Sequence, residues 1–260
     1  MFKKLILLLS LSLITSNCFA GASRLFDGTN DYIAVSADRI DTSNTGTVAF
    51  WFNIPAFVNG DCFFGYGDSD TAGGAAGSIF KIELRNHATC GSSARVGFIY
   101  QPNDDGTGVD AFTGVSTIST NTWYFYTLSS SGSTWKIYVN GVSETPCFWQ
   151  GTNTGQWWDD LIPNGTDGTD IGAVFFEGTR TAFMNANIAY VQVYNRQLTD
   201  DEVKQIMHYP GSVNGLVGYW PVWGVTSPEP DLSGLGNTGT VTEAAESTNG
   251  PPIFLSGGSK

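Results

Sequence analysis

The chain is 260 residues long and contains 32 glycines, about 12% of its residues against an average glycine content of ~7%. Charged residues make up only 14%, and 12 Lys and Arg face 24 Asp and Glu, so the net charge is −12. This composition excludes a charged helical bundle, and it excludes a nucleic-acid binder because the basic surface that contacts phosphates is missing. Hydrophobic residues at 41% and aromatic residues at 13% predict a packed core rather than a disordered chain.

The first twenty residues have the pattern of a secretory signal peptide. Lys3 and Lys4 precede an apolar run over residues 5–14, and small residues at Cys18 and Ala20 suit cleavage directly after Ala20. The run is too short to span a bilayer. Cys18 raises the alternative of a lipoprotein, although the residues before it match a lipobox poorly. We therefore expect a mature protein that is secreted, periplasmic or on the cell surface, without membrane insertion.

Segments with a period of two predict β-strands along most of the mature chain. The clearest covers residues 80–85, where Phe80, Ile82 and Leu84 alternate with charged side chains, as in a strand buried on one face. Further aromatic and β-branched runs cover residues 47–54, 96–100, 123–129, 135–142 and 188–194. Clusters of Gly, Ser, Asn and Asp separate these runs, as is typical of turns. Many short strands at this spacing predict an all-β sandwich or barrel.

The chain contains one clear helix signal, near its C-terminal third. Thr199 and Glu202 form a capping box, and the acidic residues between them oppose the positive end of the helix dipole. We expect Val203, Ile206 and Met207 to form its buried stripe, and the helix should end before Tyr209.

No change in composition large enough to mark a second domain follows the helix. We therefore expect one domain over residues 21–255, in which residues 215–255 form a trailing closing segment, and a flexible tail over residues 256–260.

Three cysteines remain after removal of the leader, which is an odd number for an oxidising compartment. Cys62 begins an apolar run and Cys90 ends the segment that follows the 80–85 strand. We expect these two to form a disulfide and Cys147 to be free. The spacings match no zinc motif, and the chain has only 2 histidines.

Four blocks of sequence, in this order, resemble the laminin-G-like, concanavalin A-like lectin/glucanase superfamily: residues 25–35 (LFDGTNDYIAV), 47–55 (TVAFWFNIP), 121–142 (NTWYFYTLSSSGSTWKIYVNGV) and 187–203 (NIAYVQVYNRQLTDDEV). The resemblance implies a two-sheet antiparallel jelly-roll sandwich with roles in glycan binding, adhesion or attachment. Residues 215–221 and 231–241 resemble a segment often found at the start of such domains. Here that segment trails, as a closing strand or as the stub of a lost repeat.

The superfamily also contains glucanases, so catalytic carboxylates are a further possibility for this chain. A glycosidase needs two of them, ~5 Å apart for retention or ~6.5–9.5 Å for inversion. The glucanase branch carries a Glu-x-Asp-x-x-Glu strand, and no segment here matches it, since Glu83 is followed by Leu84, Arg85 and Asn86. A catalytic pair formed by acids on two neighbouring strands is left open by the sequence. The dinucleotide-like motif at residues 234–239 opens no helix and is attributed to chance in a Gly-rich tail.

The segment from residue 147 to residue 160 is the first candidate binding site. Aromatic faces suit the C–H faces of sugars, and carboxylates accept hydrogen bonds from hydroxyl groups. The candidate ligand-binding residues are Phe148, Trp149, Trp157, Trp158 and Asp159. The alternative is that these tryptophans cap the edge of the sandwich. Because neighbouring residues of an extended strand point to opposite sides, we expect Trp157 or Trp158 to face solvent.

Acidic turns provide a second candidate site, for Ca²⁺, which takes six to eight oxygen ligands. The candidate ligands are Asp27, Asp31, Asp68, Asp70 and Asp231, with a further acidic turn at Asp167 and Asp170. The resemblance favours Asp27, whose turn we expect to meet Asp231 of the trailing segment. Ordinary Asx turns would also explain each of these clusters.

Together these features predict a secreted, non-catalytic carbohydrate-binding or adhesion module, with calcium as the candidate stabilising ion and a glycan or polysaccharide as the expected partner. The alternative is a structural or assembly protein of a cell surface or virion, in which the sandwich packs on protein neighbours. A polysaccharide hydrolase with unrecognised catalytic residues is the third hypothesis.

Overall fold

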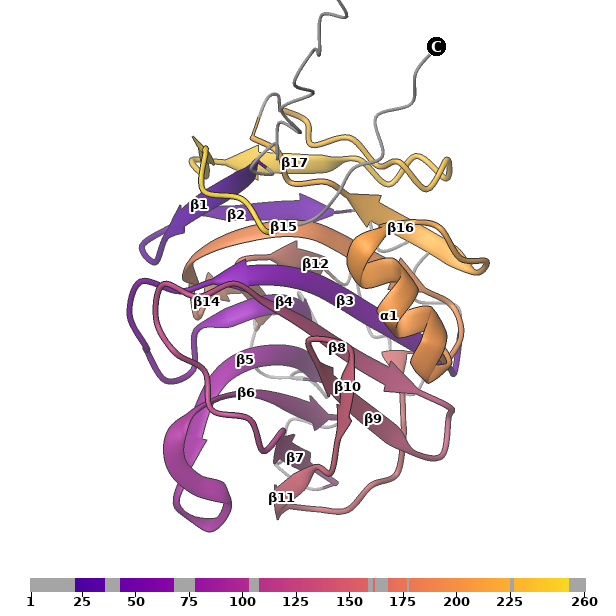
Figure 1. Cartoon of the computed structure of the whole chain (residues 1–260). Coiled ribbons are helices and arrows are strands. Elements are labelled where there is room, and N and C mark those ends of the chain that lie inside the picture. The colour runs from indigo at the N-terminus through magenta and orange to yellow at the C-terminus, as the bar shows by residue number, and fades with distance from the viewer. Residues whose placement is uncertain are drawn as a thin grey trace, which may run out of the picture.

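A computed structural model describes residues 22–35, 43–67, 78–102, 108–158, 161, 168–176, 178–224 and 227–252. In this part of the chain, two large antiparallel sheets pack face to face, with one helix outside them (Figure 1). The predicted all-β sandwich of jelly-roll type is therefore confirmed. The expected leader, the C-terminal tail, Asp68, Asp70, Asp159 and Asp167 lie outside the described residues.

The first sheet, sheet A, contains β1 (Ser23–Asp27), β3 (Gly46–Asn53), β8 (Tyr124–Ser130), β9 (Trp135–Val139), β10 (Val142–Glu144), β15 (Asn185–Tyr194), β16 (Leu216–Trp220) and β18 (Ala245–Ser247). Its order is β10-β9-β8-β3-β15-β1-β18, and β16 also pairs with β15. The single strand predicted over residues 135–142 is wrong: Asn140 and Gly141 both have positive φ, at 51° and 75°, and form the tight turn of a hairpin between β9 and β10.

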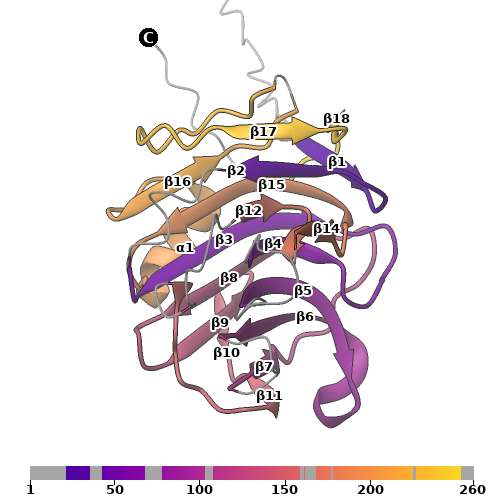
Figure 2. The ribbon, with the colours of Figure 1, turned by 180° about the vertical axis from the view of Figure 1, so that it is seen from behind.

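The second sheet, sheet B, contains β2 (Tyr32–Val35), β4 (Cys62–Gly67), β5 (Ile79–His87), β6 (Gly91–Gln101), β7 (Asp110–Thr113), β11 (Cys147–Gln150), β12 (Gly168–Ile171) and β17 (Gly239–Thr242). Its order is β11-β7-β6-β5-β4-β12-β2-β17. One short 3-10 turn, η1 (Ala88–Cys90), joins β5 to β6. A separate hairpin, β13 (Val174–Phe176) with β14 (Thr179–Thr181), lies against β4 and β12 (Figure 2).

The core lies between the two sheets and is rich in aromatic rings. Phe80, Ile82 and Leu84 of β5 are fully buried in it, as the period-two pattern predicted. From sheet A, Phe50 and Phe52 of β3 reach the same cluster, and both contact the ring of Phe63, with centroids 5.2 and 4.5 Å apart. The opposite side chains of β5 therefore lie on the other face of sheet B, away from sheet A.

One helix, α1 (Asp200–His208), covers the outer face of sheet A. Its predicted capping box is present, since Thr199 accepts a hydrogen bond from the Glu202 amide and Glu202 accepts one from the Thr199 amide. Val203 and Ile206 are fully buried against that face of the sheet. Among the described residues, no helix is long and apolar enough to cross a membrane.

The segment after α1 returns to both sheets. It contributes β16 and β18 to sheet A and β17 to sheet B (Figures 1 and 2). Arg24 of β1 and Glu229 form an almost fully buried ion pair at 3.0 Å, and the Arg24 guanidinium also donates to the carbonyl of Ala244. These contacts tie the N-terminal strand of the domain to its last segment.

Candidate functional site

Because α1 covers sheet A, the outer face of sheet B is the large sheet face that no helix of the described residues covers (Figures 1 and 2). Strand alternation puts Lys81, Glu83 and Arg85 of β5 on this face, opposite the core residues described above. Arg95 of β6 lies on the same face because it is directly opposite Arg85 in the strand register. A chain with a net charge of −12 therefore gathers basic side chains at this place.

Glu83 lies among these basic groups and is fully buried. Its carboxylate oxygens are 2.7 Å from Lys81 Nζ and 3.2 Å from Arg85 Nη1. Arg95 instead donates from Nη1 to the backbone carbonyl of Gly114, at 3.0 Å. Among the residues that the structure describes, Arg95 forms no ion pair.

Trp149 lies beside Arg85 and His87, at the end of β5. Its ring stacks on His87, with centroids 5.3 Å apart and planes 17° apart, and Arg85 Cζ is 5.3 Å from its centroid. His87 Nδ1 accepts a hydrogen bond from the Thr89 amide, so Nε2 remains as its donor. The side chains of Trp149, His87 and Arg95 are all partly exposed, and that of Arg85 is 26% exposed. We call Arg85, His87, Arg95 and Trp149 the basic–aromatic cluster.

A disulfide between Cys90 and Cys147 holds this cluster together, so the predicted pairing of Cys62 with Cys90 is wrong. Cys62 lies opposite Glu83 in the β4–β5 register, whereas Cys90 comes after the far end of β5. Cys62 is free and fully buried, and burial raises the pKa of its thiol. The bridge joins η1 to the first residue of β11, and Trp149 follows two residues later.

The expectation that Trp157 or Trp158 faces solvent is also wrong, since each is only 1% exposed. They follow β11 in a non-strand segment, so strand alternation does not apply to them. Their rings stack at 5.1 Å within the core, and the centroid of Phe80 is 5.0 Å from that of Trp157. A Cβ at Gly46 would lie 2.2 Å from Trp157 Nε1, which explains the glycine at the start of β3. These two tryptophans build the core.

The other two aromatic candidates, Phe148 and Trp149, lie in different surroundings. Phe148 is partly buried and packs on the core, with its ring centroid 4.7 Å from that of Phe112. Trp149 is thus the member of the predicted set that reaches the partly exposed cluster. Arg85, His87 and Arg95 were not among the predicted site residues, although the alternation that buries Phe80 and Leu84 also predicts that Arg85 faces outward.

The β13–β14 hairpin covers the other end of the outer face. Arg180 of β14 pairs with the fully buried Asp170 at 3.0 Å, and its guanidinium lies 4.2 Å from the ring centroid of Tyr32. Burial raises the pKa of Asp170 to about 6, against the lowering effect of Arg180. A Cβ at Gly65 or Gly67 would collide with the hairpin, so these glycines let it lie close to β4. Among the described elements, the hairpin therefore leaves uncovered the end of the face that carries the basic–aromatic cluster.

The structure brings together part of the predicted calcium site. Asp31 accepts a hydrogen bond from the Asp27 amide at 2.8 Å, and Asp27 accepts one from Thr29 at 2.8 Å, as in an Asx turn. Glu243 joins them, since it accepts a hydrogen bond from Asn30 at 2.8 Å. Burial raises the pKa of Asp31, and the charges of Asp27 and Glu243 add to this effect. In the described ranges, no group of three or more His, Cys, Asp and Glu is arranged to hold a metal ion.

Asp231 does not meet this turn, contrary to expectation. Its carboxylate accepts hydrogen bonds from the Tyr219 amide at 2.9 Å and from amides of its own loop. Tyr219 lies opposite Gln192 near one end of β15, whereas Asp27 lies opposite Asn185 at the other end. Asp231 therefore organises the loop after β16.

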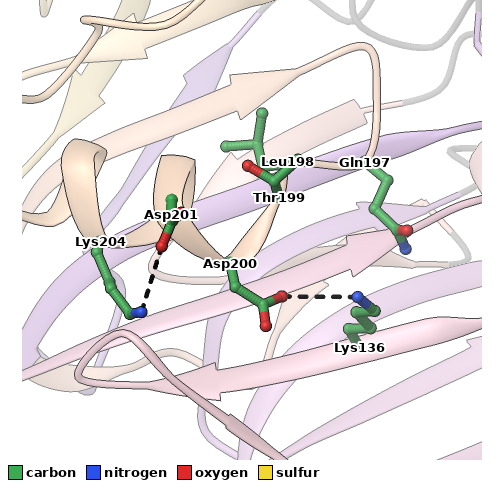
Figure 3. A pocket seen from close by; sticks show the side chains of 7 residues that line it. All are labelled: Lys136, Gln197, Leu198, Thr199, Asp200, Asp201 and Lys204. Carbon is green, nitrogen blue, oxygen red and sulfur yellow. Dashed lines mark hydrogen bonds and ion pairs between the residues drawn. The ribbon is translucent and has the colours of Figure 1, made fainter.

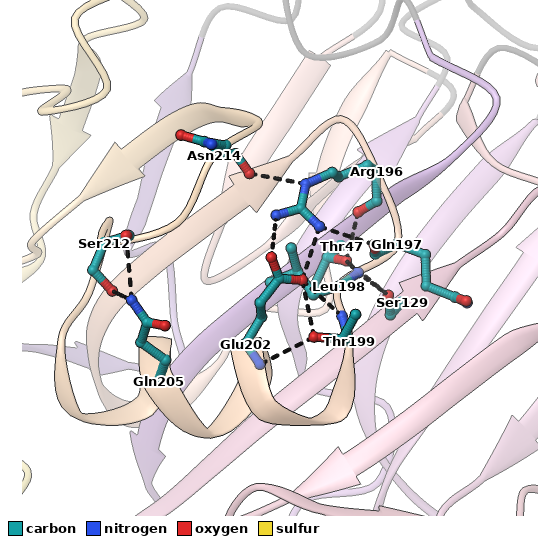
Figure 4. Close-up of polar contacts among 10 residues, drawn as sticks. All are labelled: Thr47, Ser129, Arg196, Gln197, Leu198, Thr199, Glu202, Gln205, Ser212 and Asn214. Carbon is teal, nitrogen blue, oxygen red and sulfur yellow. Dashed lines mark hydrogen bonds and ion pairs between the residues drawn. The ribbon is translucent and has the colours of Figure 1, made fainter.

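A polar pocket of about 530 Å³ lies beside the N-terminus of α1 (Figure 3). Its lining residues are Lys136, Gln197, Leu198, Thr199, Asp200, Asp201 and Lys204. The charges pair among themselves, Lys136 with Asp200 at 3.6 Å and Lys204 with Asp201 at 3.4 Å. Next to it, Arg196 binds Glu202 through both terminal nitrogens, at 2.8 and 2.6 Å (Figure 4). The pairs of Lys136 and Arg196 fasten α1 to the sandwich, and together the three pairs leave little unpaired charge for a ligand.

Three solved structures show what this fold is similar to. A protein of Bacteroides ovatus, provisionally described as carbohydrate binding, is 18% identical with a TM-score of 0.61; the match covers 90% of this chain and 62% of that one. The carbohydrate-binding module CBM40 of the Ruminococcus gnavus IT-sialidase, bound to α2,3-sialyllactose, is 15% identical with a TM-score of 0.55. The match covers 72% of this chain and 96% of that one. A heptameric SAP-like pentraxin of Limulus polyphemus is 13% identical with a TM-score of 0.53, and the match covers 86% of this chain and 97% of that one.

At these identities the likeness shows the fold alone. The chain spans 62% of the length of the Bacteroides ovatus chain that it matches. Among curated proteins, none matches this sequence.

A family comparison extends over most of the chain. Residues 27–204, well over half of its length, match the sequence model of one superfamily, and the two-sheet sandwich described above is the fold that this superfamily shares. The chain belongs to the concanavalin A-like lectin/glucanase superfamily.

Proposed function

We propose that this chain is a non-catalytic carbohydrate-binding module that binds its glycan on the outer face of sheet B, at the basic–aromatic cluster. The observation that carries the proposal is the position of Trp149, which lies partly exposed beside His87 and Arg85 on a sheet face without a helix. An aromatic ring next to hydrogen-bond donors suits a sugar, which offers C–H faces and hydroxyl groups together.

The solved structures support the same class of function. Two of them are described by their carbohydrate binding, provisionally for the Bacteroides ovatus protein and with a bound sialyllactose for the Ruminococcus gnavus module. Burial of the acids supports a role without catalysis, because Glu83 and Asp170, the carboxylates that the described part of the chain places on this face, are both fully buried and cannot flank a glycosidic bond there.

The disulfide supports a place outside the cytoplasm. Cys90 and Cys147 are bridged, and such bonds persist mainly in oxidising compartments. Together with the signal-peptide pattern of residues 1–20, this favours a secreted, periplasmic or cell-surface protein.

A glycan array with the mature domain tests the proposed function. We expect binding to at least one glycan, and Trp149→Ala should weaken that binding tenfold or more while the protein stays folded. Tyr209→Ala is the matched control, because Tyr209 is a 54% exposed aromatic residue at the end of α1, on the other sheet. Absence of any glycan binding, or equal loss in both variants, would contradict the proposal.

A further inference from the structure

Two arginines of the basic–aromatic cluster stand in an unfavourable arrangement. Arg85 and Arg95 are directly opposite each other on neighbouring strands, and like charges at such positions repel. Both side chains are only partly exposed. In each of them the buried Nε has no hydrogen-bond acceptor among the described residues. A buried donor without an acceptor costs free energy, so the described residues leave each of these guanidinium groups only partly satisfied.

The charge of the surrounding face is not balanced either. Glu83 is the carboxylate that pairs with basic side chains here. Its oxygens lie 2.7 Å from Lys81 Nζ and 3.2 Å from Arg85 Nη1, so Lys81 is the closer partner. Among the described residues, Glu83 pairs with two of the three basic groups of this face, and the third, Arg95, donates its hydrogen bond to the neutral carbonyl of Gly114, so positive charge is in excess here. An anion between Arg85 and Arg95 would offset this excess and reduce their mutual repulsion.

We propose that the glycan bound at this face carries an acidic group, a carboxylate or a sulfate, that lies between the guanidinium groups of Arg85 and Arg95. A guanidinium presents its donors in a planar fork that matches such a group, so two forks from directly opposite positions of β5 and β6 can hold it through several charge-assisted hydrogen bonds. Trp149 and the Nε2 donor of His87 then contact the rest of the sugar ring. This inference rests on the proposed function and names the chemical class of its ligand.

An array of matched pairs tests the inference: each carboxylated sugar stands beside its methyl ester, and each sulfated sugar beside its unsulfated parent. We expect binding to be confined to acidic members and to weaken at least tenfold in Arg95→Gln. The two kinds of pair distinguish a carboxylate from a sulfate. Arg95→Lys should recover only part of the affinity, since a lysine restores the charge without the fork. Lys136→Gln removes a basic side chain on the other sheet and should change nothing.

Arg85→Gln should behave like Arg95→Gln. If Arg85→Gln is poorly folded because Glu83 loses one of its partners, Arg95→Gln alone decides, since Arg95 forms no ion pair among the described residues. Equal binding to a glycan and its uncharged counterpart, with affinity retained in Arg95→Gln and lost in Trp149→Ala, would overturn the acidic ligand and leave the proposed function standing. Binding to no glycan at all would overturn both.

Discussion

The tryptophans between residues 149 and 158 differ in what their removal should cost. Trp157 and Trp158 are each 1% exposed, so truncation to Ala leaves a cavity and should lower the free energy of unfolding by about 3–5 kcal/mol. Trp149→Ala should lower it by only about 1 kcal/mol, because its ring is partly exposed and packs on two polar side chains. Urea unfolding measures all three variants. Equal losses for Trp149 and Trp157 would contradict the surface position of Trp149.

Glu202 provides a pH-dependent test at the start of α1. Hydrogen bonds from Arg196, with that of the Thr199 amide, lower its pKa to about 2. A lowered pKa stabilises the fold above pH 4.5, and this contribution is lost as the pH falls toward 2. Because the carboxylate is 27% exposed, we expect Glu202→Gln to cost about 1–2 kcal/mol at neutral pH and nothing near pH 2.

Thermal unfolding from pH 7 to pH 2 measures this effect. Asp201→Asn is the control, since that side chain is 96% exposed and pairs only with Lys204 on the same helix. A Glu202→Gln deficit that stays constant down to pH 2 would show that lost geometry, and not lost charge, causes it.

At the scale of the element, the disulfide fixes β11 beside η1. It closes a loop with a sequence separation of 57 residues, and on the chain-entropy model this stabilises the fold by about 4 kcal/mol. The double variant Cys90→Ser, Cys147→Ser should lose stability of that order. It should also lose glycan affinity, because Trp149 is held by the strand that the bridge anchors.

Peptide mapping without reduction provides the direct check. We expect a Cys90–Cys147 peptide, and a Cys62 thiol that alkylating reagents reach only after unfolding, since it is fully buried. A bridge from Cys62 to either of the other cysteines would contradict the strand arrangement of sheet B.

Local patterns predicted the long strands β3, β5, β8 and β15 and the helix α1, because alternation and capping involve residues close together in sequence. The pattern around Phe80 predicted which side chains of β5 enter the core, and the Thr199 capping box predicted where α1 begins. The disulfide and the buried tryptophans depend on contacts between distant segments, as where Trp157 packs over Gly46. No local pattern contains that information.

The candidate site was only partly predictable for the same reason. Trp149 was a candidate because it is an aromatic residue in a polar segment, whereas Arg85 was an outward residue of a predicted strand and was not a candidate. Their contact depends on β11 reaching the end of β5, which follows from the order of sheet B and from the disulfide.

At the scale of the whole molecule, calcium binding at the Asp27 turn stays a prediction. A cation there would reduce the repulsion among Asp27, Asp31 and Glu243 and would join the first and last segments of the domain. We expect millimolar calcium to raise the melting temperature, because an ion bound only to the folded state stabilises it by mass action. Glu243→Gln should reduce that rise, whereas identical melting in calcium and in chelator would contradict the prediction.

The central claim is that the outer face of sheet B binds the glycan. Nuclear magnetic resonance of protein with ¹⁵N-labelled tryptophan tests this claim most directly, with the Trp149 indole signal identified by its loss in Trp149→Phe. As a bound glycan is titrated, we predict that the Trp149 signal shifts and that the signals of the buried Trp157 and Trp158 do not. A Trp149 signal that stays unchanged at saturation would contradict the account, because the binding surface would then lie elsewhere on the sandwich.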